Sequence, residues 1–169
     1  MMSKKKHPFI FLLTVLLFLS VIIFSGNGII NISIKNATPL LALPLLCGFA
    51  VFHSFEASAI AGLLTGIMLD SVSLGTYCFN AIIFLVLGCF VNLASNSLFN
   101  KNLKAAVALS VICCFAYFTA YWICFAALGK GIKNSLTYLL SYGIPSAVYS
   151  AVFIIPFYYI FRYFNKLRS

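Results

Sequence analysis

Two acidic side chains, Glu56 and Asp70, are the only carboxylate side chains among the 169 residues. Two carboxylates can do general acid–base chemistry where both reach the same substrate. If the segment between them is a helix, they stand about 20 Å apart, because a helix rises about 1.5 Å per residue. They therefore cannot act as a pair. The sequence also has no nucleophile elbow and no phosphate-binding loop, so we expect a protein that is not an enzyme.

The thiols and imidazoles are also poorly placed for chemistry. The two histidines, His7 and His53, are far apart in the sequence. Six cysteines lie in apolar stretches, and no two of them form a Cys-x-x-Cys pair. They are Cys47, Cys78, Cys89, Cys113, Cys114 and Cys124. Small apolar packing residues explain this distribution better than a metal site or disulfides, and we expect no cofactor.

Asp70 ends the apolar, glycine-containing segment 61–70. An ionisable group in a segment of membrane length is costly, so it marks a candidate functional site. Four-residue steps back from Asp70 reach Gly66, Gly62 and Ser58, which share one helix face. Such a face of small residues lets a neighbouring helix approach closely. That neighbour is either another helix of this chain or a helix of another protein.

A turn follows Asp70 and ends at Gly75. A carboxylate at the carboxyl end of a helix faces the unfavourable end of the helix dipole. We expect amide groups of this turn, or Asn80, to offset the cost, so that Asp70, Gly75 and Asn80 organise one helical hairpin. The alternative is that Asp70 is a solvated loop residue.

Other polar residues recur in helical register. Asn80, Gly88 and Asn92 predict a polar line on one face of a helix. Three tyrosines of later segments need hydrogen-bond partners if they are buried, because an unpaired hydroxyl in apolar surroundings is costly. They are Tyr117, Tyr121 and Tyr142. These tyrosines are either packing residues with partners or the lining of a solute cavity.

The composition is that of a membrane protein. Hydrophobic residues make up 63% of the chain and charged residues 8%, whereas typical soluble domains are about 25% charged. A helix needs about 20 apolar residues to span a bilayer. We expect an all-α integral membrane protein with six transmembrane helices in one bundle, forming a single domain over residues 1–169. The predicted spans are 8–24, 38–53, 57–70, 76–94, 105–128 and 136–161.

Local signals refine these spans. The first span follows three lysines, as in a signal peptide, but we expect it to be retained because the rest of the chain is also membrane sequence. Pro44 is able to kink the second span. Ser54 is expected to cap the third, with Glu56 in its first turn, where the helix dipole favours an acid.

The eleven basic residues lie in the predicted loops and tails. With six spans, eight of them share one side of the membrane with both termini, and three lie on the other side. Basic residues concentrate in cytoplasmic loops, so both termini are predicted to be cytoplasmic. The net charge of +9 therefore indicates membrane orientation, and we expect no nucleic-acid partner.

Three stretches resemble the family of rod shape-determining MreD proteins. They are Pro-Leu-Leu at 44–46, Ala-Gly-Leu-Leu-Thr-Gly-Ile-Met-Leu-Asp at 61–70, and the segment 74–88, which starts Leu-Gly-Thr-Tyr. The family signature is similar: a glycine-rich helix ending in Asp, a short turn, Leu-Gly, and an apolar helix with a glycine near its middle. The turn after Asp70 is shorter than the Gly/Pro-rich turn of the family, and the last two spans carry no part of the signature.

This resemblance implies a bacterial inner-membrane protein of the cell-elongation (rod) complex, involved in cell shape and peptidoglycan synthesis. Members of the family are not enzymes. They bind the membrane-anchored scaffold MreC and help to connect cytoplasmic MreB filaments with wall-synthesis enzymes. Their fold is similar to that of the substrate-binding S-components of energy-coupling-factor transporters.

The similarity to S-components supplies an alternative function, that of a solute-binding subunit of a vitamin transporter. In those subunits a pair of small residues four apart in the first helix docks the transport module. The first span here has no such pair, which counts against transport. A transporter subunit also needs a closed polar cavity, whereas an assembly protein needs only exposed apolar surface.

Overall fold

The structure is a computed structural model, and it describes residues 6–26, 40–72, 78–97, 102–127 and 144–168. These residues form helices and short connections, with no strand among them, so the all-α prediction is confirmed for this part of the chain. The helices are α1 (Lys6–Gly26), α2 (Ala42–Phe52), α3 (Phe55–Val72), α4 (Phe79–Ser97), α5 (Leu103–Tyr121), the π-helix η1 (Trp122–Ala127), α8 (Ile144–Val152) and α9 (Ile154–Arg168).

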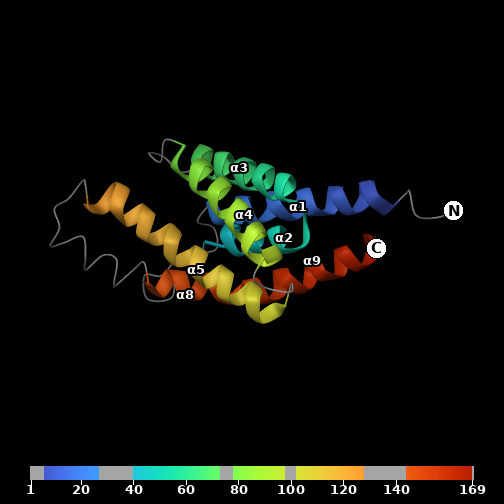
Figure 1. The fold of residues 1–169 in the computed structure, drawn as a ribbon. Helices are drawn as coiled ribbons and strands as arrows, with labels where there is room; N and C mark the ends of the chain where they lie inside the picture. Colours follow the sequence, from blue (N-terminus) through green and yellow to red (C-terminus); the bar gives the residue numbers. More distant parts are fainter. Residues whose placement is uncertain (1–5, 27–39, 73–77, 98–101, 128–143, 169) are drawn as a thin grey trace.

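Helix α2 is the centre of the fold. All of its residues from Ala42 to Val51 are buried, and it contacts α1, α3, α4, α5, α8 and α9. Its 11 residues rise about 16 Å, because an α-helix rises about 1.5 Å per residue. A bilayer core is about 30 Å thick, so α2 is a short buried helix surrounded by the other helices of the bundle (Figure 1).

The outer helices form antiparallel pairs. Helices α3 and α4 lie side by side as a hairpin, and α5 packs against α8 (Figure 1). Helix α1 begins and helix α9 ends at the same end of the bundle (Figure 1). We call this end the terminal end of the molecule.

The last predicted span, 136–161, lies partly outside the described residues. Within its described part the chain forms two helices, α8 and α9, which are separated at Phe153. Pro156 explains the break, because it has no N–H to donate to the carbonyl of Val152 and its ring crowds that carbonyl. The Phe153 N–H instead donates to the Ser150 carbonyl at 3.1 Å. Pro156 thus lies in the first turn of α9, where a missing N–H costs nothing.

Two further helix starts test the local predictions. Pro44, which could kink the second span, lies in the first turn of α2, because this helix begins at Ala42. The cap expected at Ser54 is confirmed, since the Ala57 N–H donates to Ser54 Oγ at 3.4 Å. Glu56 lies in the first turn of α3, as expected, and its side chain is exposed.

Three described helices are long and apolar enough to cross a membrane: α3, α4 and the segment Leu103–Cys124, which continues α5 into η1. Leu12–Ile23 in α1 and Ala42–Phe52 are shorter apolar stretches. Large hydrophobic side chains are exposed on the outward faces of these helices, among them Ile60 on α3 and Ile82 on α4. Lipid covers such surfaces in a membrane protein.

Candidate interaction site: the α3–α4 hairpin

The small-residue face of α3 packs against α4. Ser58, Gly62 and Gly66 are all buried. A Cβ atom added at Gly62 would collide with the backbone carbonyl of Phe84, and one added at Gly66 would collide with the backbone of Asn80 and Ala81. The two backbones therefore approach so closely that only glycine fits at these positions.

Helix α4 contributes a glycine of its own to this contact. A Cβ atom on Gly88 would lie 2.7 Å from the carbonyl oxygen of Ser58. Gly66, Gly62 and Gly88 thus follow one another along the seam between the two helices. Of the two partners considered for the face of Ser58, Gly62 and Gly66, these contacts favour another helix of the same chain.

The carboxylate of Asp70 caps helix α4. Its Oδ1 accepts hydrogen bonds from the Asn80 backbone N–H at 3.2 Å and from Asn80 Nδ2 at 2.9 Å, and its Oδ2 accepts one from the Ala81 N–H at 2.9 Å. Helix α4 begins at Phe79, so both N–H groups belong to its first turn and have no partner within the helix. Asp70 therefore stands at the carboxyl end of α3 but at the favourable, positive end of the α4 dipole.

A left-handed residue precedes the capped helix. Cys78 has φ of 62°, the one positive φ at a non-glycine residue that the described backbone contains. Such a conformation costs about 1–3 kcal/mol and persists where the surroundings determine it. The hydrogen bonds that Asp70 accepts from the backbone of Asn80 and Ala81 fix the chain shortly after Cys78. Gly75, which was predicted to belong to this turn, lies outside the described residues.

Tyr117 extends the Asp70–Asn80 contact to α5. Its hydroxyl donates to Asn80 Oδ1 at 2.7 Å, so the amide of Asn80 donates to one partner and accepts from another. Asn80 is 3% and Tyr117 is 7% exposed. This hydrogen-bonded chain of Asp70, Asn80 and Tyr117 joins α3, α4 and α5 at the end opposite the terminal end, and it gives the buried Tyr117 hydroxyl the partner that burial requires.

At the other end of α4, Asn92 binds the carboxyl end of α2. Its Nδ2 donates to the carbonyl oxygens of Ala50 at 2.8 Å and His53 at 2.7 Å. It also lies 3.4 Å from Ser58 Oγ. Carbonyls at the end of a helix lack partners within it, and Asn92 supplies one. The predicted polar line of α4 is confirmed, since Asn80, Gly88 and Asn92 are all buried on its inner face.

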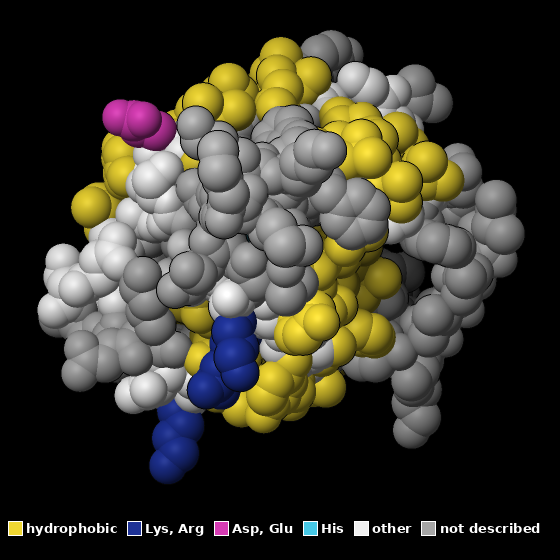
Figure 2. Space-filling model, turned by 90° about the vertical axis from the view of Figure 1, so that its right-hand side faces the viewer, with side chains coloured by type: hydrophobic (Ala, Val, Ile, Leu, Met, Phe, Trp, Pro, Cys, Tyr) yellow, Lys and Arg dark blue, Asp and Glu magenta, His cyan; other side chains and the backbone are white. Residues whose placement is uncertain are grey.

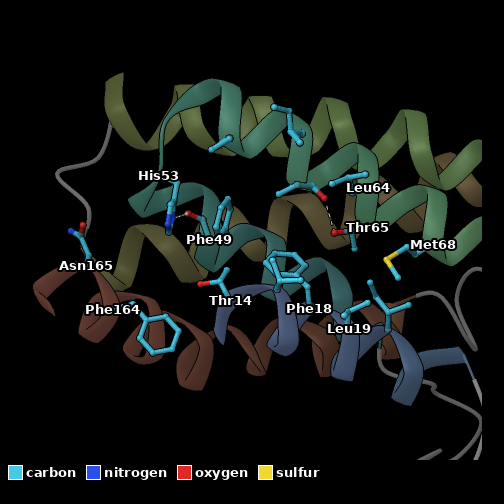
Figure 3. Close-up of a pocket in the computed structure, with 15 residues that line it drawn as sticks. Thr14, Phe18, Leu19, Phe49, His53, Leu64, Thr65, Met68, Phe164 and Asn165 are labelled. Carbon is cyan, nitrogen blue, oxygen red and sulfur yellow. Dashed lines mark hydrogen bonds between the residues drawn. The ribbon is translucent and has the colours of Figure 1, made fainter. Parts of the chain in front are cut away.

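One groove opens between α1 and α3, with a volume of about 510 Å³. Thr14, Phe18 and Leu19 line it on the α1 side, and Leu64, Thr65 and Met68 on the α3 side (Figure 3). Its surface is predominantly apolar and open to the flank of the bundle. It is therefore unlike the closed polar cavity that a solute-binding subunit needs.

The described residues contain no group of three or more His, Cys, Asp or Glu side chains that could hold a metal ion. Cys47, Cys113 and Cys114 are buried without disulfide bonds. Glu56 and Asp70 lie at opposite ends of α3.

A protein-family model described as rod shape-determining protein MreD matches residues 5–168 of this chain. No curated protein and no solved structure matches this chain. The family match covers both the α3–α4 hairpin and the helices that pack around it.

Proposed function

Since this chain belongs to the MreD family of rod shape-determining proteins, we propose that it is a non-enzymatic assembly protein of the bacterial cell-elongation complex and supports peptidoglycan synthesis there. A role in determining cell shape follows from the family itself. The observation that supports an assembly role is the α3–α4 hairpin. Its two helices pack closely along their inner faces, and Asp70 caps the start of α4. Its outer side is apolar and exposed.

The outer side of the hairpin has the form of a helix-docking surface. Ile82, Val86, Phe90 and Leu93 of α4 are all exposed, and their spacing of four, four and three residues places them on one face. We call these four residues the α4 stripe. Because α4 is held along its inner face by glycine contacts and at its start by Asp70, the stripe is presented with little freedom, and docking a second helix orders few additional groups.

The partner in this proposal is an MreC-like protein with a single transmembrane helix. Through it the chain is linked indirectly to cytoplasmic MreB filaments. An apolar stripe of this kind packs against another helix through close van der Waals contact within the bilayer. Two features support such a partner: the family match, and the absence of any extended soluble region among the described residues.

The proposed arrangement in the membrane is one domain of six crossings in the bacterial inner membrane, with both termini in the cytoplasm and a fold like that of transporter S-components. The common end of α1 and α9 supports an even number of crossings (Figure 1). Three exposed basic residues lie toward that end: Lys104 in the first turn of α5, and Arg162 and Lys166 in the second half of α9. This charge distribution favours a cytoplasmic terminal end.

Deletion and co-purification test this function. Deleting the gene from a rod-shaped host should give rounded cells, and the tagged chain should restore the rods and retain an MreC-like protein in mild detergent. Recovery of a transporter ATPase module in place of the MreC-like protein would contradict the proposal. The open, apolar groove between α1 and α3 gives that transporter alternative no support.

A further inference from the structure

The two acidic side chains limit the charge-free surface of α3. Glu56 lies in the first turn of the helix and Asp70 near its end. The stretch between them rises about 20 Å, because an α-helix rises about 1.5 Å per residue. Its exposed side chains are all large and apolar: Ile60, Leu63, Leu64 and Ile67. Figure 2 looks onto the terminal end, where α3 begins, and shows an acidic side chain at the rim beside hydrophobic ones.

Helix α4 has an apolar surface of similar length. One limit is the Asp70 carboxylate, which accepts hydrogen bonds from the N–H groups of Asn80 and Ala81 in the first turn. The other limit is Asn96, whose side chain is exposed. From Ala81 to Asn96 the helix rises about 22 Å, and the exposed side chains between them are those of the α4 stripe. Both helices of the hairpin thus present the same short apolar length to lipid.

This length is too short for an ordinary bilayer, whose hydrocarbon core is about 30 Å thick. Burying an ionised carboxylate in hydrocarbon is costly, and tilting the hairpin does not help, because a tilted helix covers less of the thickness. A long side chain can reach toward water, and the exposed Glu56 has that freedom. Asp70 does not, because Asn80 and Ala81 hold its carboxylate against α4.

Helix α5, by contrast, has the full length. In the segment formed by α5 and the start of η1, no charged residue lies between Lys104 and Cys124. This segment rises about 30 Å, which matches an ordinary hydrocarbon core. Helix α5 lies apart from α3 in the bundle (Figure 1). The molecule therefore has a short side, formed by the hairpin, and a side of full length.

We propose that the α3–α4 hairpin thins the bilayer beside it to a hydrocarbon thickness of about 20 Å, while the bilayer beside α5 keeps its ordinary thickness. An apolar stretch shorter than the hydrocarbon core is accommodated by local thinning, and lipids with short acyl chains lower its cost. The hairpin is thus a surface that favours short-chain phospholipids. The proposal concerns lipid alone, so its test needs no protein partner and is independent of the assembly role.

Spin labels measure the proposed difference in thickness. Single cysteines are introduced into a chain without the native cysteines, labelled with a nitroxide and reconstituted into vesicles of dioleoyl phosphatidylcholine. Collisions of the label with oxygen and with a water-soluble nickel complex give its depth below the nearer membrane surface. The depths are compared between the exposed faces of α4 and α5.

Two pairs of labelled positions have the same separation in sequence. Ile82 and Leu93 lie on the exposed face of α4, and Ala108 and Thr119 lie on the exposed face of α5. In a bilayer of uniform thickness, the two depths of either pair therefore add up to the same value. We expect the sum for α4 to be about 10 Å smaller than the sum for α5. Equal sums would overturn the proposal.

Glu56→Leu tests the limit at the terminal end, and it replaces an exposed side chain. The label at Leu93, near this end of α4, should then lie deeper, while the label at Ile82 should not move. The control Lys104→Leu, on α5, should leave both labels unchanged. An unchanged depth at Leu93 in Glu56→Leu would overturn the assignment of Glu56 as a limit of the apolar surface.

A second set of labels replaces the first if a variant fails to accumulate. Val86 and Phe90 on α4 have the same separation as Ile112 and Ala116 on α5, and all four are exposed. The sum of depths should again be about 10 Å smaller for the α4 pair. Equal sums for these pairs would overturn the proposal in the same way.

Discussion

The carboxylate of Asp70 accepts hydrogen bonds from both the backbone N–H and the side-chain amide of Asn80. This one relationship joins the end of α3 to the start of α4 and places the negative charge at the positive end of the α4 dipole. The first turn of α4 is thereby capped by a side chain of α3.

Replacing Asp70 should therefore destabilise the hairpin. Asp70→Leu removes the charge and both acceptor oxygens, while Asp70→Asn keeps one acceptor and loses the charge-assisted component. Hydrogen bonds to charged groups contribute about 1.5–3 kcal/mol, so the order of damage should be Leu greater than Asn. Thermal unfolding in detergent and the cellular protein level measure this. A harmless Asp70→Leu would show that Asp70 is only a solvated residue.

The glycine seam makes a prediction with an internal control. Gly66→Ala places a Cβ against the backbone of Asn80 and Ala81, which cannot move independently of α4. Gly48→Ala places a Cβ 3.2 Å from the ring of Phe161 and 3.3 Å from Cβ of Phe157, and a movement of a few tenths of an ångström relieves both contacts. We expect Gly66→Ala to cost about 1–3 kcal/mol, as overpacking does, and Gly48→Ala to cost less.

Unfolding in detergent compares the two alanine variants directly, and the larger substitution Gly66→Leu extends the series. Gly66→Leu should lower protein level, partner recovery and rescue of rod shape together. If it behaves like the parent in all three, then Ser58, Gly62 and Gly66 are not a contact face.

Tyr117→Phe should loosen α5 from the hairpin. It removes the hydroxyl that donates to Asn80 Oδ1 and leaves that buried oxygen without this partner, at a cost of about 1–3 kcal/mol. Tyr159→Phe is the matched control, because Tyr159 is exposed on α9. Equal unfolding temperatures for the two variants would contradict a structural role for the Tyr117 hydroxyl.

Topology is tested with cysteines introduced at Lys35 and Lys101 in a background without the native cysteines. Six crossings with cytoplasmic termini place Lys35 outside and Lys101 inside. A membrane-impermeant thiol reagent applied to intact cells should therefore label the cysteine at 35 and label the one at 101 only after lysis. Reversed or mixed labelling would contradict the six-span arrangement.

Part of this structure can be predicted from sequence because it is local. The register of Ser58, Gly62 and Gly66 follows from helical periodicity, and Ser54 directly precedes the helix that it caps. The association of Asp70 with Asn80 can also be inferred, because a carboxylate at the wrong end of a dipole needs donors nearby.

Contacts between distant segments carry no comparable signal. Asn92 reaches the carbonyls of Ala50 and His53, and helical register alone does not identify those partners. The left-handed backbone of Cys78 has no signature in the sequence, since cysteine is not a residue that favours this conformation. The break at Phe153 could have been inferred from Pro156, but a proline near a helix end and one inside a helix look alike until the end is known.

The most direct test of an assembly role is site-specific photo-crosslinking in living cells. A photoreactive amino acid at Val86, in the α4 stripe, should crosslink to an MreC-like protein. The same amino acid at Ile112, equally apolar and exposed on α5, should not. Crosslinks to that partner from Ile112 but not from Val86, or from neither position while both variants restore rod shape, would contradict docking on the α3–α4 hairpin.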